Sequence, residues 1–138
     1  MAAATLVKKL LIKPGYQLLV MNAPDGYTQR LEPLPEGTRL YTSPGGRFDE
    51  VLVFAGSKAE LDRYAPVALQ AVKPGGLLWF AYPKKTSKIK TDINRDTGWD
   101  AATSAGWLPV TQIAVDDTWS ALRFRPESEI KTITRKRE

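Results

Sequence analysis

Five basic side chains fall within twelve residues of one polar stretch, and this stretch is the part of the sequence best suited to bind a ligand. It gives residues 84–95 a charge of +4, although the whole chain of 138 residues carries only +5. Like charges repel one another, and a long polar loop in a compact domain usually has a role. The stretch therefore predicts a site for an anionic partner, against the alternative of a solvated charged surface. The five residues are Lys84, Lys85, Lys88, Lys90 and Arg95.

Several kinds of catalytic and metal site are excluded because the sequence lacks the residues that form them. It has no cysteine and no histidine, which excludes disulfides, thiolate metal sites and cysteine nucleophiles. Ser43 and Ser57 lie near the ends of expected strands, but a serine triad without histidine is implausible. Lys8 and Lys9 interrupt the apolar start of the chain, and the longest apolar runs are too short to span a bilayer. We therefore expect a cytoplasmic protein without a membrane partner.

Two groups of acidic residues resemble metal sites only in part. Asp116 and Asp117 are adjacent, and adjacent carboxylates in a turn point apart, which favours a turn over a metal pair. Asp92, Asn94 and Asp96 alternate as in a calcium loop, but the glycine and the closing glutamate of such a loop are missing. No metal site is expected.

The basic stretch follows the unit around which the chain is organised. Residues 51–54 and 77–82 are short apolar runs, and the stretch between them has the length and pattern of a helix. Ser57 can cap this helix with Glu60 three residues later, and the Pro and Gly residues of 73–76 end it. Two buried strands joined by such a helix form a parallel strand–helix–strand unit. The buried helical face is formed by Leu61, Tyr64, Ala65, Ala68, Leu69 and Val72.

The segments before this unit predict a second parallel strand and its neighbours. Residues 2–12 favour a helix, and residues 16–22 form an unbroken apolar strand of the kind that lies at the centre of a sheet. A turn-rich stretch then opens a short helix over 28–31, and residues 38–42 form a brief strand. Asp49, at the entry to the next strand, is expected to have a structural role.

The segments after the basic stretch predict a helix and a hairpin. Residues 93–105 favour a helix that carries Trp99 and ends at Gly106. Residues 107–115 and 118–125 are β-rich and are separated by a two-residue acidic turn, which indicates an antiparallel hairpin. The other three tryptophans are expected in the core, whereas Trp99, beside the basic stretch, could also contact a ligand.

This order of elements, with three short motifs, resembles the class I methyltransferases. The motifs are Leu-Ile-Lys-Pro-Gly before the first strand, Phe-Asp-Glu-Val from Phe48, and Val-Lys-Pro-Gly-Gly from Val72. The resemblance covers most of residues 5–125 and implies an α/β fold: a truncated, Rossmann-like three-layer sandwich whose mostly parallel sheet ends in an antiparallel hairpin. Residues 1–126 would form this single domain, followed by a basic, flexible tail at 127–138. The chain is also similar to short bacterial proteins of uncharacterised function, through residues 91–96 and 119–124.

The sequence departs from the methyltransferase pattern where the cofactor would bind. The turn after the first strand, residues 22–26, has one glycine and a proline at Pro24, where those enzymes have a glycine-rich turn. Residues 38–43 offer no acidic group for the ribose, and about one strand–helix unit is missing before Phe48. Residues 55–58 replace the usual motif after the middle strand. We therefore expect no cofactor and a non-catalytic binding or regulatory module. A small S-adenosylmethionine-dependent methyltransferase with an atypical turn remains the alternative.

In an open α/β sheet, ligands bind beyond the carboxyl ends of the strands, near the point where the strand order reverses. The loops at 22–27, 56–58 and 82–95 should meet there, and no catalytic residue is predicted among them. The partner would be an anionic small molecule carrying phosphate or the backbone of a nucleic acid. The predicted ligand-binding residues are Asn22, Asp25, Tyr27, Ser57, Lys84, Lys85, Lys88, Lys90 and Arg95.

Overall fold

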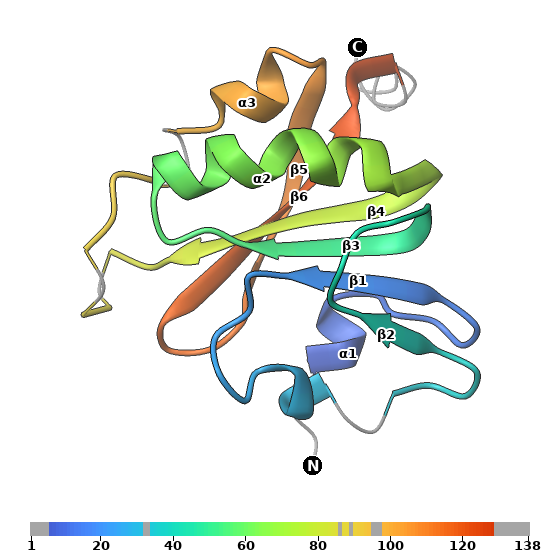
Figure 1. The fold of residues 1–138 in the computed structure, drawn as a ribbon. Coiled ribbons are helices and arrows are strands. Elements are labelled where there is room, and N and C mark those ends of the chain that lie inside the picture. The colour runs from blue at the N-terminus through green and yellow to red at the C-terminus, as the bar shows by residue number, and fades with distance from the viewer. Residues whose placement is uncertain (1–5, 32–33, 86, 89, 95–97, 129–138) are drawn as a thin grey trace, which may run out of the picture.

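A computed structural model describes residues 6–31, 34–85, 87–88, 90–94 and 98–128. These residues form a six-stranded sheet with helices on both faces (Figure 1), which confirms the predicted fold class. The strand order is β2-β1-β3-β4-β6-β5. The strands are β1 (Gln17–Met21), β2 (Arg39–Tyr41), β3 (Phe48–Phe54), β4 (Val72–Pro83), β5 (Trp107–Ala114) and β6 (Trp119–Pro126).

The register of the sheet confirms the predicted strand neighbours. Val51 on β3 lies opposite Leu19 on β1 and Leu78 on β4, and both pairs of strands are parallel. β6 pairs antiparallel with β4 and with β5, so the hairpin extends one edge of the sheet. β1, β3 and β4 are covered on both faces, which explains why their sequences contain unbroken apolar runs.

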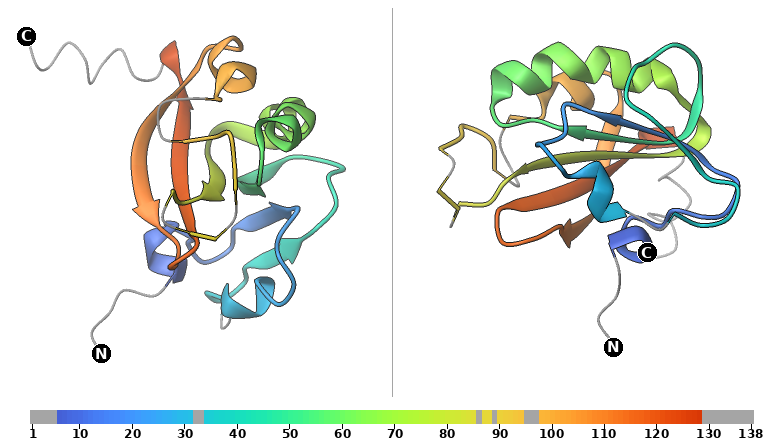
Figure 2. Two further views of the ribbon diagram at one scale, coloured as in Figure 1. Left: turned by 90° about the vertical axis from the view of Figure 1, so that its left-hand side faces the viewer. Right: turned by 60° about the horizontal axis from the view of Figure 1, so that its bottom comes forward.

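One face of the sheet is covered by α2 (Lys58–Ala71) and the short α3 (Asp100–Thr103), as Figures 1 and 2 show. The predicted cap is present, because the Ser57 hydroxyl accepts a hydrogen bond of 3.3 Å from the Glu60 backbone N–H. The apolar side of α2 packs on Val51, Val53 and Phe80 of the sheet. Its buried residues are Leu61, Ala65, Ala68 and Ala71.

The opposite face carries much less helix among the described residues. It is covered by α1 (Leu6–Lys9) and the 3₁₀ helix η1 (Thr28–Leu31), which contribute to a second apolar cluster. Leu10, Tyr27 and Leu31 pack there against the sheet residues Leu52 and Trp79. The two clusters divide the core into the layers on either side of the sheet. No helix of the described residues is long and apolar enough to cross a membrane.

Three sequence-based boundaries were wrong, and the backbone explains each. The helix expected at 93–105 is reduced among the described residues to α3, because Gly98 has a φ of +102° and its backbone lies against Ile93. The helix expected at 2–12 is described only from Leu6, and it ends before Leu11, which has a φ of +64°. Residues 73–76 do not separate α2 from a later strand, because β4 begins at Val72, directly after the helix.

Gly76 shows why glycine is needed within this early part of β4. A Cβ atom there would lie 2.8 Å from the Asp49 carbonyl oxygen, which is too close for any side chain. The chain also passes from β2 to β3 through residues 42–47 alone, without a further strand or helix in that segment. The expected absence of one strand–helix unit before β3 is therefore confirmed.

Candidate functional site

The carboxyl ends of β1, β3 and β4 lie at one edge of the sheet, on the left in Figure 1. The amino end of α2 lies at the same edge, and so does the described part of the basic segment, residues 84–94 without 86 and 89. The strand order reverses between β1 and β3, because β2 lies beside β1 on one side and β3 on the other. Two places at this edge could therefore hold a ligand: the point of reversed strand order, where β1 and β3 end, and the surroundings of the basic segment.

Side chains bridge the carboxyl ends of β1 and β3. Asn22, which follows β1 with a φ of +60°, donates through its amide to the Phe54 carbonyl oxygen at 2.7 Å and to Glu60 Oε1 at 3.2 Å. The same Glu60 oxygen accepts a hydrogen bond of 2.7 Å from the Gly56 backbone N–H. These polar groups at the ends of β1 and β3 are thus bonded to one another.

The amino end of α2 is also occupied by side chains of the protein. Asp92 Oδ1 accepts a hydrogen bond of 2.7 Å from the backbone N–H of Lys58, and Ser57 caps the N–H of Glu60. The Lys58 ammonium lies 2.9 Å from Asp62 one turn along the helix. Asp92 therefore ties the basic segment to α2 and supplies the negative charge that a helix N-terminus favours.

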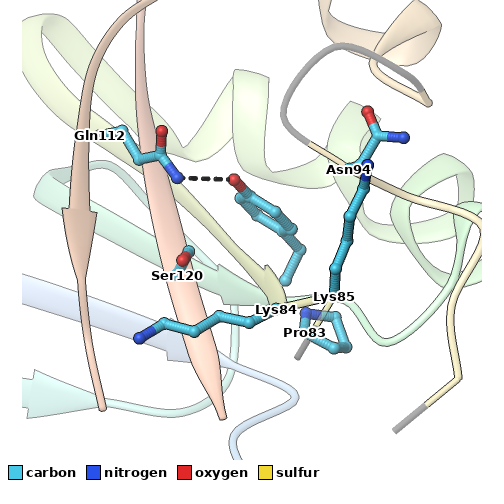
Figure 3. Close-up of a pocket in the computed structure, with 7 residues that line it drawn as sticks. Pro83, Lys84, Lys85, Asn94, Gln112 and Ser120 are labelled. Carbon is cyan, nitrogen blue, oxygen red and sulfur yellow. Dashed lines mark hydrogen bonds between the residues drawn. The ribbon is translucent and has the colours of Figure 1, made fainter. Parts of the chain in front are cut away.

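The basic segment borders a pocket of about 270 Å³ at the end of β4 (Figure 3). Two of its described lining residues are lysines and none is acidic. The Gln112 amide on β5 donates a hydrogen bond of 3.0 Å to the Tyr82 hydroxyl, and Ser120 on β6 lies opposite Tyr82 in the sheet. In Figure 3 the Lys84 and Lys85 side chains extend in different directions. The lining residues are Tyr82, Pro83, Lys84, Lys85, Asn94, Gln112 and Ser120.

Hydrogen bonds to the rest of the fold hold this pocket in shape. The Lys84 backbone N–H donates to the Thr118 carbonyl oxygen at 2.7 Å, and the Ser87 hydroxyl donates to the Lys84 carbonyl oxygen at 2.7 Å. The Trp99 indole N–H donates to the Asn94 carbonyl oxygen at 2.8 Å. Trp99 is only 5% exposed, and its ring lies 5.4 Å from that of Tyr82, so it anchors the segment from within the core.

A second pocket of about 460 Å³ lies next to the first. Lys85 and Asn94 line both pockets, so the two hollows meet at these side chains. The second pocket adds one further lysine, Lys90, and one carboxylate, Asp92, which is bonded to α2. Its lining residues are Lys85, Ser87, Lys90, Thr91, Asp92, Ile93 and Asn94.

The structure brings some of the predicted ligand-binding residues together. Lys84 and Lys85 line the first pocket, and Lys85 and Lys90 line the second. Lys88 is exposed in the same segment but lines neither of these pockets. Arg95 lies outside the described residues.

The remaining predicted residues lie elsewhere. Asn22 and Ser57 belong to the hydrogen bonds at the ends of β1 and α2. Asp25 is exposed in the turn after β1 and lines neither of the two pockets. Tyr27 is 2% exposed, and its ring packs edge-on against Phe54 at 4.4 Å, so it is a core residue without a face for a ligand.

The sequence did not identify the polar residues of the hairpin as part of a site. Gln112 and Ser120 reach the pocket only because β6 pairs with β4 and β5 pairs with β6. The sole signal in the sequence was their polar character within two β-rich segments. Asn94 and Tyr82 lay within the predicted loop region but were not singled out.

The acidic residues considered in the sequence have structural roles. Asp116 Oδ1 accepts hydrogen bonds of 2.8 Å from the backbone N–H groups of both Thr118 and Trp119, which confirms its role in the turn. Asp49 accepts a hydrogen bond of 2.8 Å from the Gln17 backbone N–H and forms an ion pair of 3.2 Å with Lys73. The described residues hold no cluster of three groups suited to a metal ion.

One titratable group lies far from this edge, near the amino end of β3. Glu50 is fully buried, and burial raises the pKa of its carboxyl group from 4.5 to about 8. The nearby Trp79 indole and the Arg123 guanidinium lower the pKa of Glu50, but less strongly. Neither carboxyl oxygen has a hydrogen bond of good geometry among the described residues. The Glu50 carboxyl group is therefore mostly protonated, and so uncharged, at pH 7.

Comparison with solved structures places this fold among methyltransferases. A structure described as a DhpI–SAH complex is 15% identical over 88% of this chain and 82% of its own, with a TM-score of 0.60. A SAM-dependent methyltransferase from Aquifex aeolicus is 10% identical over 86% of each chain, with a TM-score of 0.61. TrmN from Thermus thermophilus gives 11% identity over 88% of this chain and 47% of its own, with a TM-score of 0.61. No known protein family and no curated protein matches the sequence. The chain thus has a class I methyltransferase-like domain, and at these identities the likeness concerns the fold alone.

Proposed function

We propose that this methyltransferase-like domain is a non-catalytic binding module, and that it binds a phosphate-bearing anion in the pocket at the end of β4. The observation that carries the proposal is the composition of this pocket. Lys84 and Lys85 supply two positive charges, and no described lining residue is acidic. Hydrogen bonds between ammonium groups and phosphate oxygens are charge-assisted and stronger than those between neutral groups.

The neutral side chains of the pocket also suit an anion. The amides of Gln112 and Asn94 and the hydroxyl of Ser120 carry N–H or O–H donors at the pocket wall. Since Gln112 is bonded to Tyr82, its amide is already ordered before a ligand binds, and Trp99 and Thr118 hold the backbone of the segment at Asn94 and Lys84. Ordered donors reduce the entropy cost of binding.

The hydrogen bonds between the ends of β1 and β3 support the proposal that the chain no longer binds the cofactor. Asn22 and Glu60 bridge the place where the related fold binds its cofactor, and Pro24 follows in the turn. A cofactor that displaced the Asn22 side chain would break its hydrogen bonds to Phe54 and Glu60. Each such bond contributes about 0.5–1.5 kcal/mol.

A small S-adenosylmethionine-dependent methyltransferase is the second candidate, and the comparisons support it. Similar solved structures are described as complexes with SAH and with SAM. In this case the cofactor would lie against residues 22–26. Crystals grown with S-adenosylhomocysteine test this candidate, which predicts electron density for the cofactor at that turn, whereas the first proposal predicts none.

Calorimetric titration with inorganic phosphate and with short oligonucleotides tests the main proposal. The variant Lys84→Ala/Lys85→Ala should weaken binding at least tenfold, because it removes both positive charges of the pocket. The control Lys13→Ala/Arg47→Ala removes the same charge from exposed residues before β1 and β3, at the opposite edge of the sheet, and should leave binding unchanged. Equal affinity in wild type and the pocket variant would contradict the proposal.

The salt dependence of the same titrations separates a small ligand from a nucleic acid. Binding of duplex DNA falls with a slope of about −0.9 per neutralised phosphate on logarithmic axes, because each contact releases a counterion. A small phosphate ligand should give a shallow dependence. The basic tail could also contribute, so the titrations are repeated after replacement of Lys131, Arg135, Lys136 and Arg137 by alanine.

A further inference from the structure

We infer that the ligand carries two adjoining anionic groups, as a diphosphate does, and that it bridges the two pockets across Lys85 and Asn94. This inference rests on the proposed function and names the chemical class of the ligand. Its basis is that the two pockets share these two side chains, with Lys84 on one side and Lys90 on the other.

The positions of the three lysines indicate how many anionic groups the ligand carries. Lys84 and Lys85 line the first pocket, whereas Lys85 and Lys90 line the second. A single phosphate in either pocket would leave one outer lysine without a partner. Two phosphates joined in series would place one group in each pocket and let Lys85 contact both. Three ammonium groups would then offset the higher negative charge of a diphosphate.

The acidic residue of the second pocket has a positive partner outside it. Asp92 Oδ1 accepts the Lys58 backbone N–H at 2.7 Å, so the amino end of α2 offsets part of its negative charge. Thr91 accepts a hydrogen bond from the Ile93 backbone N–H through Oγ1, which leaves its hydroxyl hydrogen as a donor. Lys90 and Thr91 can therefore both donate to an anion in the second pocket.

The sizes of the pockets also favour a ligand larger than one phosphate. They measure about 270 and 460 Å³, against roughly 30 Å³ for one water molecule in the liquid. Inorganic phosphate has five non-hydrogen atoms and would fill a small part of either. A diphosphate with a further group attached would use both.

Calorimetric titrations of the full chain with inorganic phosphate and with pyrophosphate, at matched ionic strength, test the inference. Pyrophosphate should bind at least tenfold more tightly. Lys90→Ala should then weaken pyrophosphate at least tenfold more than it weakens phosphate. The matched control is Lys88→Ala, which removes the same charge from the same segment but lines neither pocket, and it should change either affinity less than twofold.

Three results would overturn the inference, and they are distinguishable. If phosphate binds but pyrophosphate binds no more tightly, the proposed function stands and the two-pocket ligand is wrong. If Lys88→Ala and Lys90→Ala weaken pyrophosphate binding equally, the effect comes from the overall positive charge of the segment and not from a defined site. If neither ion binds, the proposed function fails together with the inference.

Discussion

The Asn22 side-chain amide donates a 2.7 Å hydrogen bond to the carbonyl oxygen of Phe54, and so links the carboxyl ends of β1 and β3. The same amide lies 3.2 Å from Glu60 Oε1, which also accepts the Gly56 backbone N–H. Methyltransferase-like sheets bind ligands at this point of reversed strand order. In this chain the protein's own polar groups are paired with one another there.

The first prediction concerns Asn22 itself. Asn22→Gly removes both side-chain hydrogen bonds but tolerates the φ of +60°, and should lower the free energy of unfolding by about 1 kcal/mol. Asn22→Asp has the same shape, yet it cannot donate to Phe54 and places a second carboxylate beside Glu60. It should therefore be less stable than the glycine variant at neutral pH. Urea unfolding measures both, and an aspartate variant as stable as wild type would contradict the network.

The second prediction is a pH dependence that comes from Glu50. Its pKa is about 8 in the folded protein and near 4.5 when unfolded, so the folded state binds more protons between these values. Stability should therefore fall as the pH rises from about 4.5 to 8, and then level off. At about 1.4 kcal/mol for each pKa unit, the loss approaches about 5 kcal/mol.

Glu50→Gln removes this dependence, since the amide cannot ionise. Subtracting the unfolding free energy of the glutamine variant from that of wild type at each pH isolates the Glu50 contribution. The difference should be largest at pH 8 and above, with wild type the less stable protein there. A difference that does not change between pH 5 and pH 8 would show that Glu50 has an ordinary pKa.

The third prediction concerns the bond between Asp92 and the amino end of α2. Asp92→Ala removes the acceptor for the Lys58 backbone N–H and should free the basic segment. Trypsin should then cleave after Lys85, Lys88 or Lys90 several-fold faster than in wild type. Asp92→Asn keeps a neutral acceptor, so its cleavage rate should lie between those of wild type and the alanine variant. Unchanged cleavage in the alanine variant would mean that other contacts hold the segment.

The fourth prediction separates the two roles of Trp99. Trp99→Phe loses the hydrogen bond to the Asn94 carbonyl oxygen but keeps an aromatic ring beside Tyr82 and Phe80. It should lower the free energy of unfolding by about 1 kcal/mol. Trp99→Ala also leaves a cavity and should cost about 3–5 kcal/mol. Phosphate binding should weaken in the phenylalanine variant if the Asn94 side of the pocket depends on this bond.

The sequence predicted the central sheet because three of its strands are covered on both faces. The unbroken apolar run at 16–22 and those at 51–54 and 77–82 correspond to β1, β3 and β4. The cap at Ser57 and the turn at Asp116 were predictable because each depends on neighbours within three residues. The broken helix at 93–105 was not, since its periodicity suggested a helix and Gly98 packs against Ile93 only in the folded chain.

The site was predictable in part, for a similar reason. A run of lysines is visible in the sequence, so Lys84, Lys85 and Lys90 were predicted. Gln112 and Ser120 come to the pocket through strand pairing over thirty residues or more, which no local pattern specifies. Tyr27 was predicted to bind a ligand from its place in a turn, but its ring is buried in the core against Phe54.

Calorimetric titration of the wild-type chain with S-adenosylmethionine, at physiological cofactor concentration, tests the account most directly. The same sample is then titrated with pyrophosphate, which shows that the protein is folded and able to bind. We predict no saturable heat with S-adenosylmethionine and a saturable signal with pyrophosphate. A dissociation constant in the low micromolar range for S-adenosylmethionine would contradict the account, because the place where β1 and β3 end would then still accept the cofactor.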